Sequence, residues 1–376
     1  MASSVSKRVA VIGSAQTHIR SSWPERQHVD LISEAVVAAL KGTGLRIDDV
    51  DFVIDSGSDF LDGRSISNCG FLGAMGAHHK EESRVEEDGL WSALYAATKV
   101  ASGSARVGLV VAYSKSSESD PRSYWSSMAE PFAQRPVGLD HQAVAGLAAQ
   151  AYLARAGLTA SDLTAVTATR YEAAGQNRWI DAGPATLDEP GADDVVASPL
   201  RRRDLARTGD GAVAVVVADA DIARQTRAEP AWITGLGSAV DQHFVAARDL
   251  SSLAAAHAAA RQAYERSGTS AQDIDLFEVS ANSAVGELQV LEALGLADQY
   301  RGIGLVRDEQ TRHINPSGGA LPADVVMATG LIRLHEVASQ LTGRSERETG
   351  TSTKGLAHGS GGLGMQNNCV MILETA

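Results

Sequence analysis

Two stretches of the chain repeat one pattern and decide its fold: EAVVAALKGTGLRIDDVDFVI at residues 34–54 and AAAHAAARQAYERSGTSAQDIDLFEV at residues 254–279. Each begins with an Ala-rich amphipathic stretch that ends at a glycine. A short polar turn containing Asp follows, and then a buried apolar run. This order predicts a helix closed by glycine, a capped turn and a strand. A shorter copy at residues 151–168, AYLARAGLTASDLTAVTA, predicts the same elements.

Four apolar runs predict further strands, at residues 8–12, 107–113, 212–217 and 369–373. They consist mainly of Val, Ile, Leu and Ala without alternation, which is typical of strands buried on both faces. Strands of this kind that alternate with helices predict βαβ units and a largely parallel or mixed sheet. Two copies of such a unit would pack into a layered αβαβα sandwich, so the predicted class is α/β.

The polar region at residues 114–198 interrupts this pattern and is rich in Ser, Gly, Pro and Asp. Long loops in compact domains are commonly functional, so we expect an inserted loop domain that covers a site. The alternative is an unstructured insertion. The aromatic residues Tyr124, Trp125, Phe132 and Trp179 favour the first interpretation, because such side chains are expected to be buried.

Composition narrows the class of protein. The chain has 376 residues, 44% hydrophobic and 21% charged, which suffices for two domains or one large pseudo-symmetric unit. Its net charge of −13 disfavours nucleic-acid binding, and no apolar stretch reaches the 18 residues of a membrane span. Cys69 and Cys369 form no metal-type pair, and the N-terminus lacks an apolar signal core. These features predict a cytoplasmic protein.

Six motifs occur in the order found in the thiolase superfamily. They are RVE at 84–86 before a helix, VGLVVAYSKSSE at 107–118, SPL at 198–200 with TGDGA at 208–212, EV at 278–279 with GEL at 286–288 and LEALG at 291–295, NPSGG at 315–319, and HGSGGLG at 358–364. The chain thus resembles this superfamily over nearly its whole length, especially the bacterial and archaeal branch related to sterol-carrier-protein-linked thiolases. The resemblance implies a thiolase fold of two similar halves, residues 1–225 with the insertion and residues 226–376. It also implies a dimer contact at strand 107–113.

The residues that perform thiolase chemistry are missing from these motifs. Thiolases need a cysteine nucleophile, acid–base groups and an oxyanion hole. Where the family has its nucleophile, this chain has EEDGLW at residues 86–91, without a thiol. No His follows NPSGG, where the family has Gly-His-Pro, and SANS at 280–283 replaces another His-containing segment. His358 alone remains, at the place of the second catalytic cysteine, which is His in some relatives.

The candidate acid–base residues are therefore His358, Asp324 and a carboxyl at the lost nucleophile position, Asp88 or Glu87. An ionised carboxylate would repel a thioester oxygen or an enolate, which argues against Asp88 and Glu87. Four glycines are candidates for presenting backbone N–H groups to a carbonyl oxygen, and they also suit tight turns. They are Gly318, Gly319, Gly361 and Gly362.

The other reactive side chains have simpler explanations. Cys69 is a small buried residue or a relocated nucleophile, whereas Cys369 belongs to the core. His313 is expected to be structural. His141, at the start of a helix, could face the site, but a position at the surface or a capping role is favoured. The pair at residues 78–79 indicates a solvated loop, and no metal site is predicted.

The resemblance implies a coenzyme A thioester as ligand, bound under the inserted region with basic residues near its phosphates. The arginines of that region are Arg170, Arg178, Arg201 and Arg202, and surface ion pairs are their other explanation. No cofactor is expected to be bound covalently.

Three functions remain open. The first is a non-catalytic subunit, or pseudoenzyme, of an acyl-CoA thiolase or acyltransferase complex. It would be a homodimer, pair with an active thiolase paralogue, or assemble with a small OB-fold/zinc-ribbon acyl-CoA-binding protein. The second is an acyltransferase or retro-aldolase that uses His358 and carboxylates without a Cys nucleophile. The third is a structural oligomer without a ligand.

Overall fold

The computed structural model describes residues 8–308, 313–345 and 352–375. Its described strands form a nine-stranded sheet in the order β3-β2-β4-β7-β1-β8-β11-β10-β9, and a separate pair, β5-β6. The N-terminal strands of the large sheet are β1 (Val9–Gln16), β2 (Phe52–Ser56), β3 (Glu81–Val85), β4 (Val107–Ser114) and β7 (Gly211–Asp219). The C-terminal strands are β8 (Ala231–Val240), β9 (Leu276–Val279), β10 (Lys354–Gly361) and β11 (Asn367–Glu374). The small pair is β5 (Val195–Ala197) and β6 (Leu200–Arg201).

The sheet is mixed, as the sequence predicts. β2 runs parallel to both β3 and β4, and β9 runs parallel to β10, while the other pairs in the large sheet are antiparallel. β1 joins the two halves, because Val9 lies opposite Asp219 of β7 and also opposite Ile233 of β8. All four strands predicted from continuous apolar runs are present.

The two long repeats fold as predicted. Helix α1 (His28–Lys41) leads through a 3-10 turn into β2, and α8 (Ala254–Ser267) leads through a similar turn into β9. The turn before β9 is held by Ser270 and Asp273, because the Asp273 carboxylate accepts the backbone N–H of Ser270. Gly268 ends α8 with a φ of 67°, a backbone conformation that glycine adopts without strain.

The third copy departs from the prediction. Helix α5 (His141–Ala156) is followed by helix α6 (Leu163–Ala174), not by a strand. Leu163, Val166, Arg170 and Ala174 recur every three or four residues, and all four are buried on one face of α6. The helical spacing of these side chains therefore decides the structure of this segment, and the predicted strand at its end is wrong.

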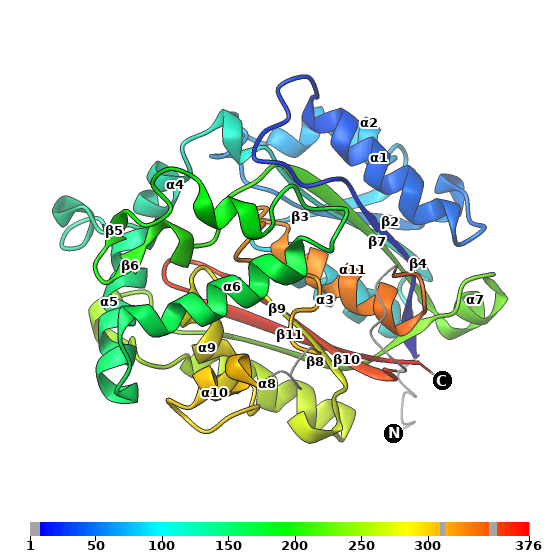
Figure 1. Cartoon of the computed structure of the whole chain (residues 1–376). Helices are drawn as coiled ribbons and strands as arrows, with labels where there is room; N and C mark the ends of the chain where they lie inside the picture. Colours follow the sequence, from blue (N-terminus) through cyan, green and yellow to red (C-terminus); the bar gives the residue numbers. More distant parts are fainter. Residues whose placement is uncertain (1–7, 309–312, 346–351, 376) are drawn as a thin grey trace.

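The helices form layers around the sheet (Figure 1). Helices α3 (Gly89–Ala101) and α11 (Thr329–Leu341) share the largest core cluster with residues from both halves of the sheet. The cluster of α1 and the short α2 (Leu72–Met75) covers one outer face, and α8 packs with α9 (Ala284–Ala293) on the other. This arrangement confirms the α/β class and the predicted layers. The short helices α7 (Ala220–Gln225) and α10 (Gly302–Arg307) complete this part of the chain, and no described helix is long and apolar enough to cross a membrane.

The predicted dimer contact at strand 107–113 is wrong. This strand is β4, which pairs with β2 on one side and β7 on the other. All eight of its residues are buried. A strand whose two hydrogen-bonding edges are occupied cannot pair with a second chain, and the edge strand of this half is β3.

The inserted region is largely helical. It contains α4 (Pro121–Ser127), α5 and α6, which gather on one side of the sheet together with the β5-β6 pair (Figure 1). Tyr124 is buried as expected, whereas the Phe132 side chain is 89% exposed, so the expected burial of Phe132 is wrong. Phe132 lies in a turn held by the Glu130 carboxylate, which accepts the backbone N–H groups of Phe132 and Ala133. Hydrogen bonds between the Glu130 side chain and the backbone, not burial of Phe132, hold this turn.

A buried ion pair anchors α11 to β9. Arg333 Nη1 lies 2.9 Å from Glu278 Oε2, and both side chains are fully buried. Glu278 also accepts hydrogen bonds from Ser317 Oγ at 2.6 Å and from Gln340 Nε2 at 2.9 Å. Removing one charge from such a pair leaves the other uncompensated in a low-dielectric core.

We expect Arg333→Met to lower the free energy of unfolding by about 3–5 kcal/mol, because Glu278 would stay buried without its counter-charge. Urea denaturation followed by circular dichroism measures the change. The control is Arg261→Ala, which removes an exposed pair with Glu265 on α8 and should change stability by at most about 0.5 kcal/mol. Equal effects of the two changes would contradict the special role of the buried pair.

Candidate functional site

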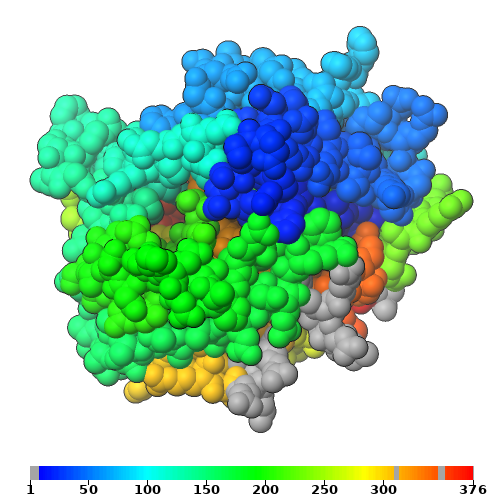
Figure 2. Space-filling model, turned by 45° about the horizontal axis from the view of Figure 1, so that its top comes forward, coloured from blue at the N-terminus to red at the C-terminus, as the bar shows by residue number. Residues whose placement is uncertain are grey.

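A pocket of about 440 Å³ opens where the inserted helices face the carboxyl ends of β9 and β10. Its floor contains Asp88 before α3, Thr329 at the start of α11, Ser280 after β9 and Gly361 at the end of β10. Side chains of α4 and α5 form one wall. The space-filling view shows a hollow between the turquoise and green segments, with orange and red C-terminal residues at its bottom (Figure 2).

Asp88 connects the two helices that begin at this floor. Its Oδ1 accepts the backbone N–H of Leu90 in α3 at 2.9 Å, and its Oδ2 accepts that of Gly330 in α11 at 2.8 Å. One carboxylate thus caps the N-termini of both central helices, where unpaired N–H groups and the helix dipoles favour negative charge. A Cβ atom on Gly330 would lie 2.1 Å from Asp88 Oδ1, so this contact requires glycine.

Two more carboxyl groups lie beside Asp88. Asp324 Oδ1 accepts a hydrogen bond from Thr329 Oγ1 at 2.7 Å. Glu87 Oε1 accepts the backbone N–H of Asp88 at 3.2 Å, and its Oε2 accepts a short hydrogen bond from Asn367 Nδ2. All three acidic side chains line the pocket.

Burial changes the protonation of these groups. It raises the pKa of Asp88 to about 7, although the N–H groups of Leu90 and Gly330 favour the charged form. Burial also raises the pKa of Glu87 and that of Asp324, against hydrogen bonds from Asn367 and Thr329 respectively. The repulsion expected from the sequence applies only to ionised carboxylates. A protonated carboxyl group can instead donate a hydrogen bond to a carbonyl or enolate oxygen.

Comparisons with known proteins agree with this architecture. Residues 237–375 match the family described as thiolase C-terminal domain-like. The acetyl-CoA acetyltransferase of Methanocaldococcus jannaschii is 28% identical over 351 residues, 89% of each chain. The steroid side-chain-cleaving aldolase of Thermomonospora curvata is 26% identical over 323 residues, 80% of each chain. A solved Ltp2-ChsH2(DUF35) aldolase superposes with a TM-score of 0.82, at 21% identity over 98% of each chain. Solved thiolases share this architecture as well.

The chain has the thiolase fold. The predicted resemblance to the thiolase superfamily is therefore confirmed by the family match in the C-terminal region and by the relatives, and the structural neighbours confirm the fold. Within this fold, β3 and α3 flank the segment where the sequence places the lost nucleophile, and Asp88 occupies the helix N-terminus there.

The thiolase-fold pocket contains part of the predicted site. Asp88, Asp324, Gly361 and Gly362 all line it, so residues far apart in sequence meet as the motifs suggest. His358 lies outside the lining and is fully buried, with its Nε2 3.0 Å from Asn368 Oδ1. Burial lowers the pKa of His358 to about 4, which keeps the imidazole neutral. The structure therefore gives His358 a packing and hydrogen-bonding position, not a direct contact with a ligand in this pocket.

The NPSGG glycines and three of the four predicted arginines lie outside the pocket lining. Gly318 and Gly319 have φ angles of 103° and 70°, so the turn between β9 and α11 requires them. Arg201 pairs with Asp193 at 3.5 Å, and the Arg178 guanidinium lies 4.8 Å from the ring centre of Trp179. Arg170, also predicted from the resemblance, is buried against Glu287 at 2.6 Å. These contacts favour the structural explanation for all five residues.

His141 lines the pocket, although the sequence favours a position at the surface or a capping role. Its ring centre lies 5.9 Å from that of Trp125, and burial lowers the pKa of His141. It follows Asp140, the N-cap of α5, and this cap is the local signal that the imidazole sits at a helix start. Arg202 lines the rim as predicted, and three further arginines join it there. They are Arg122, Arg203 and Arg207.

The cysteines and the remaining histidines do not line the pocket. Cys69 is exposed and Cys369 is buried in β11, and neither lines the pocket. His313 packs near Phe277, with 6.0 Å between ring centres. Within the part of the chain that the structure describes, no group of three or more His, Cys, Asp or Glu residues is arranged to hold a metal ion.

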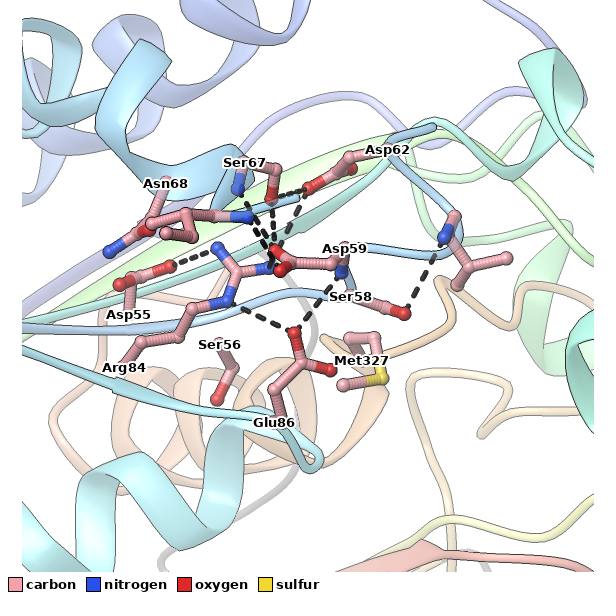
Figure 3. Close-up of polar contacts among 12 residues, drawn as sticks. Asp55, Ser56, Ser58, Asp59, Asp62, Ser67, Asn68, Arg84, Glu86 and Met327 are labelled. Atoms are coloured by element: carbon pink, nitrogen blue, oxygen red, sulfur yellow. Dashed lines mark hydrogen bonds and ion pairs between the residues drawn. The ribbon is translucent and has the colours of Figure 1, made fainter. Parts of the chain in front are cut away.

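A polar cluster around Arg84 supports the segment that carries Glu87 (Figure 3). Arg84 Nη1 donates to Asp55 Oδ2 at 3.0 Å, and Glu86 Oε1 accepts the backbone N–H of Asp59 at 3.1 Å. Burial raises the pKa of Asp55 to about 8, an effect that the Arg84 charge opposes. These contacts tie β2, β3 and the loop after β2 together behind the pocket.

Asp88 should make stability depend on pH. Between the unfolded pKa of 3.8 and the folded pKa of about 7, the native chain holds a proton that the unfolded chain has released. The free energy of unfolding should therefore fall as pH rises through this window, by at most about 1.4 kcal/mol per pH unit. Urea denaturation of the wild type and of Asp88→Asn at pH 5, 6, 7 and 8 tests this. A difference between the two proteins that stays constant with pH would contradict the assigned pKa.

Proposed function

We propose that this thiolase-fold protein is an aldolase-type enzyme that forms or cleaves a carbon–carbon bond of a coenzyme A thioester without a covalent intermediate. The observation that carries the proposal is the set of three carboxyl groups, Glu87, Asp88 and Asp324, at the floor of a pocket that neither cysteine of the chain lines. Burial raises the pKa of each group, that of Asp88 to about 7, and raised carboxyl pKa values favour proton transfer.

The chemistry follows from the groups present. Cleavage of a β-keto thioester by a thiolase requires a nucleophile that attacks the keto carbon. Cleavage of a β-hydroxy thioester requires only a base at the hydroxyl group. Loss of that proton drives the hydroxyl carbon to a carbonyl, breaks the bond to the α-carbon and leaves an enolate. A protonated carboxyl group then returns a proton to the α-carbon, which gives an aldehyde or ketone and an acyl-CoA.

The relatives support this reading. The steroid side-chain-cleaving aldolase is similar over most of the chain, and acetyl-CoA acetyltransferase is the name of another relative. For the ligand, the four rim arginines can meet the phosphates of coenzyme A. Several are partly neutralised, since Arg207 pairs with Glu189 at 3.1 Å, whereas the exposed Arg202 contacts the Gly191 carbonyl oxygen through Nε.

A non-catalytic subunit is the second candidate. The position of His358 favours it, because the last imidazole kept from the family's chemical positions is fully buried outside the pocket lining. Such a subunit would pair with an active thiolase paralogue or with a second copy of itself. The matched aldolase is named for two components, Ltp2 and ChsH2(DUF35), which supports assembly with a second protein. A small OB-fold/zinc-ribbon acyl-CoA-binding partner remains part of either proposal.

An exchange experiment separates the two candidates. An aldolase that makes and protonates an acyl-CoA enolate should exchange the α-protons of acetyl-CoA in D₂O, and a non-catalytic subunit should not. Mass spectrometry of the recovered acetyl-CoA measures the deuterium, and intact mass of the protein should show no acetyl adduct. The double variant Cys69→Ser, Cys369→Ala should exchange at the wild-type rate. An acetyl group trapped on either sulfur would contradict the non-covalent mechanism.

The rim arginines should bind the ligand phosphates. We expect Arg202→Ala to weaken coenzyme A binding by about three- to tenfold, because one exposed charge contact is lost. Isothermal titration calorimetry measures the dissociation constant, and added salt should reduce the difference. The matched control is Arg224→Ala on α7, which lies away from the inserted helices (Figure 1). Equal affinities of the two variants would contradict a role for Arg202.

A further inference from the structure

The three pocket carboxyl groups are not equivalent, because their oxygen atoms are occupied in different ways. Both oxygens of Asp88 accept N–H groups at helix N-termini, and its side chain is enclosed between Gly330 and Gly359. A Cβ atom on Gly359 would lie 2.9 Å from Asp88 Oδ1. Asp88 therefore has no oxygen free for a ligand unless one helix loses its cap.

Asp324 is held more loosely. Its backbone is fixed, since its N–H donates to the Arg207 carbonyl and its carbonyl accepts the Gly209 N–H. Its Oδ1 accepts a hydrogen bond from Thr329 Oγ1. The same hydroxyl oxygen of Thr329 lies 3.0 Å from the Val325 carbonyl oxygen. Asp324 is thus linked to α11 through the side chain of Thr329, the first residue of that helix.

Glu87 has the geometry of a reacting group. It lies between β3 and α3, half-buried, with its carboxyl group at the pocket surface. A Cβ atom on Gly361 would lie 1.8 Å from Glu87 Oε1, so the carboxyl group rests directly on the backbone at the end of β10. Both of its oxygens accept hydrogen bonds, Oε1 from the Asp88 N–H and Oε2 from the Asn367 side-chain amide, but neither donor is an N–H group inside a helix. Three separate elements therefore orient Glu87, and its side chain stays partly exposed, unlike that of Asp88.

We propose that Glu87 is the catalytic residue that removes and returns the α-proton of the acyl-CoA, and that Asp88 is a positioning residue. This assignment rests on the proposed aldolase function. In the enolisation step the bond between the α-carbon and its hydrogen breaks and the proton passes to a Glu87 oxygen. The electron pair moves into the thioester carbonyl group and forms the enolate. In the reverse step Glu87 returns the proton, or a deuteron after exchange with solvent, to the α-carbon.

The variant Glu87→Gln should remain folded. Asn367 Oδ1 is buried without a hydrogen-bond partner in the described structure, while Asn367 Nδ2 donates to Glu87. A flip of the Asn367 amide would let its oxygen accept from the introduced side-chain amide. The other oxygen can still accept the Asp88 N–H. The change therefore removes the ionisation of Glu87 with little effect on packing.

The test measures deuterium exchange of acetyl-CoA in D₂O by the full-length chain. We expect Glu87→Gln to slow exchange by about 100-fold or more, the usual contribution of a general base, with unchanged coenzyme A affinity. The matched control is Glu86→Gln, the same chemical change one residue earlier. Glu86 faces Arg84 and Asp59, behind the pocket, and its side chain is 53% exposed (Figure 3). Its variant should exchange within about twofold of the wild type.

The pH profile separates catalysis from positioning. The wild-type exchange rate should rise with pH as Glu87 ionises, and this limb should be absent in Glu87→Gln. Asp88→Asn should lower the melting temperature and the rate but keep the limb, because an Asn oxygen can accept only one of the two helix N–H groups at full strength. Gly361→Ala should act like Glu87→Gln on the rate, since the new methyl group displaces the carboxyl group.

The outcomes separate the assignment of Glu87 from the proposed aldolase function. Exchange that survives in Glu87→Gln but disappears in Asp88→Asn or Asp324→Asn would reject the assignment and leave the aldolase function intact. Exchange that survives in all three variants would equally reject Glu87 as the base. A wild-type chain that binds coenzyme A but exchanges no α-proton would reject the aldolase function together with the assignment.

Discussion

The Asp88 carboxylate is the contact on which the site depends. It joins the N-termini of α3 and α11, which come from different halves of the chain and share the central layer of the fold. Each helix start carries N–H groups without intrahelical partners, and a buried start without acceptors would be strongly unfavourable. The Asp88 side chain accepts one backbone N–H group from each helix and so links the two helix starts at the pocket floor. The glycines at positions 330 and 359 make room for it, so the contact involves three separate segments.

This arrangement explains how a carboxyl group can stand at the position where the resemblance to the thiolase superfamily predicts a nucleophile. A helix N-terminus stabilises negative charge, which suits a thiolate and a carboxylate alike. Burial acts in the opposite direction and raises the pKa values of all three pocket carboxyl groups. The balance of these two effects produces acidic groups that titrate closer to neutral pH than exposed ones. The same floor therefore suits proton transfer, whereas it lacks the sulfur that covalent acyl transfer requires.

Much of the site's setting was predictable, because it follows from local patterns. The six motifs identified the fold. Six of the candidate residues do line one pocket: Glu87, Asp88, Arg202, Asp324, Gly361 and Gly362. His358 does not line the pocket. It is buried because β10 pairs with β9 on one side and with β11 on the other, which the sequence does not show. His141 was underestimated because a helix-start histidine looks the same in sequence whether it faces solvent or a pocket. The sequence also could not distinguish Glu87 from Asp88, because two adjacent carboxyl groups can accept hydrogen bonds from quite different parts of the chain.

The sequence by itself determined the two long helix–turn–strand repeats, the four strands of continuous apolar residues, and the order of the motifs in which no thiol stands at the expected nucleophile position. Those properties depend on side-chain periodicity, glycine and capping residues, and residue identity, all of which act over a few positions. Only the tertiary structure decided that β4 is an interior strand and that three carboxyl groups lie at the floor of one pocket. These outcomes depend on contacts between segments hundreds of residues apart, such as Asp88 with Gly330, and on the burial that such contacts create. Protonation follows burial, so the chemistry of the pocket is a property of the fold.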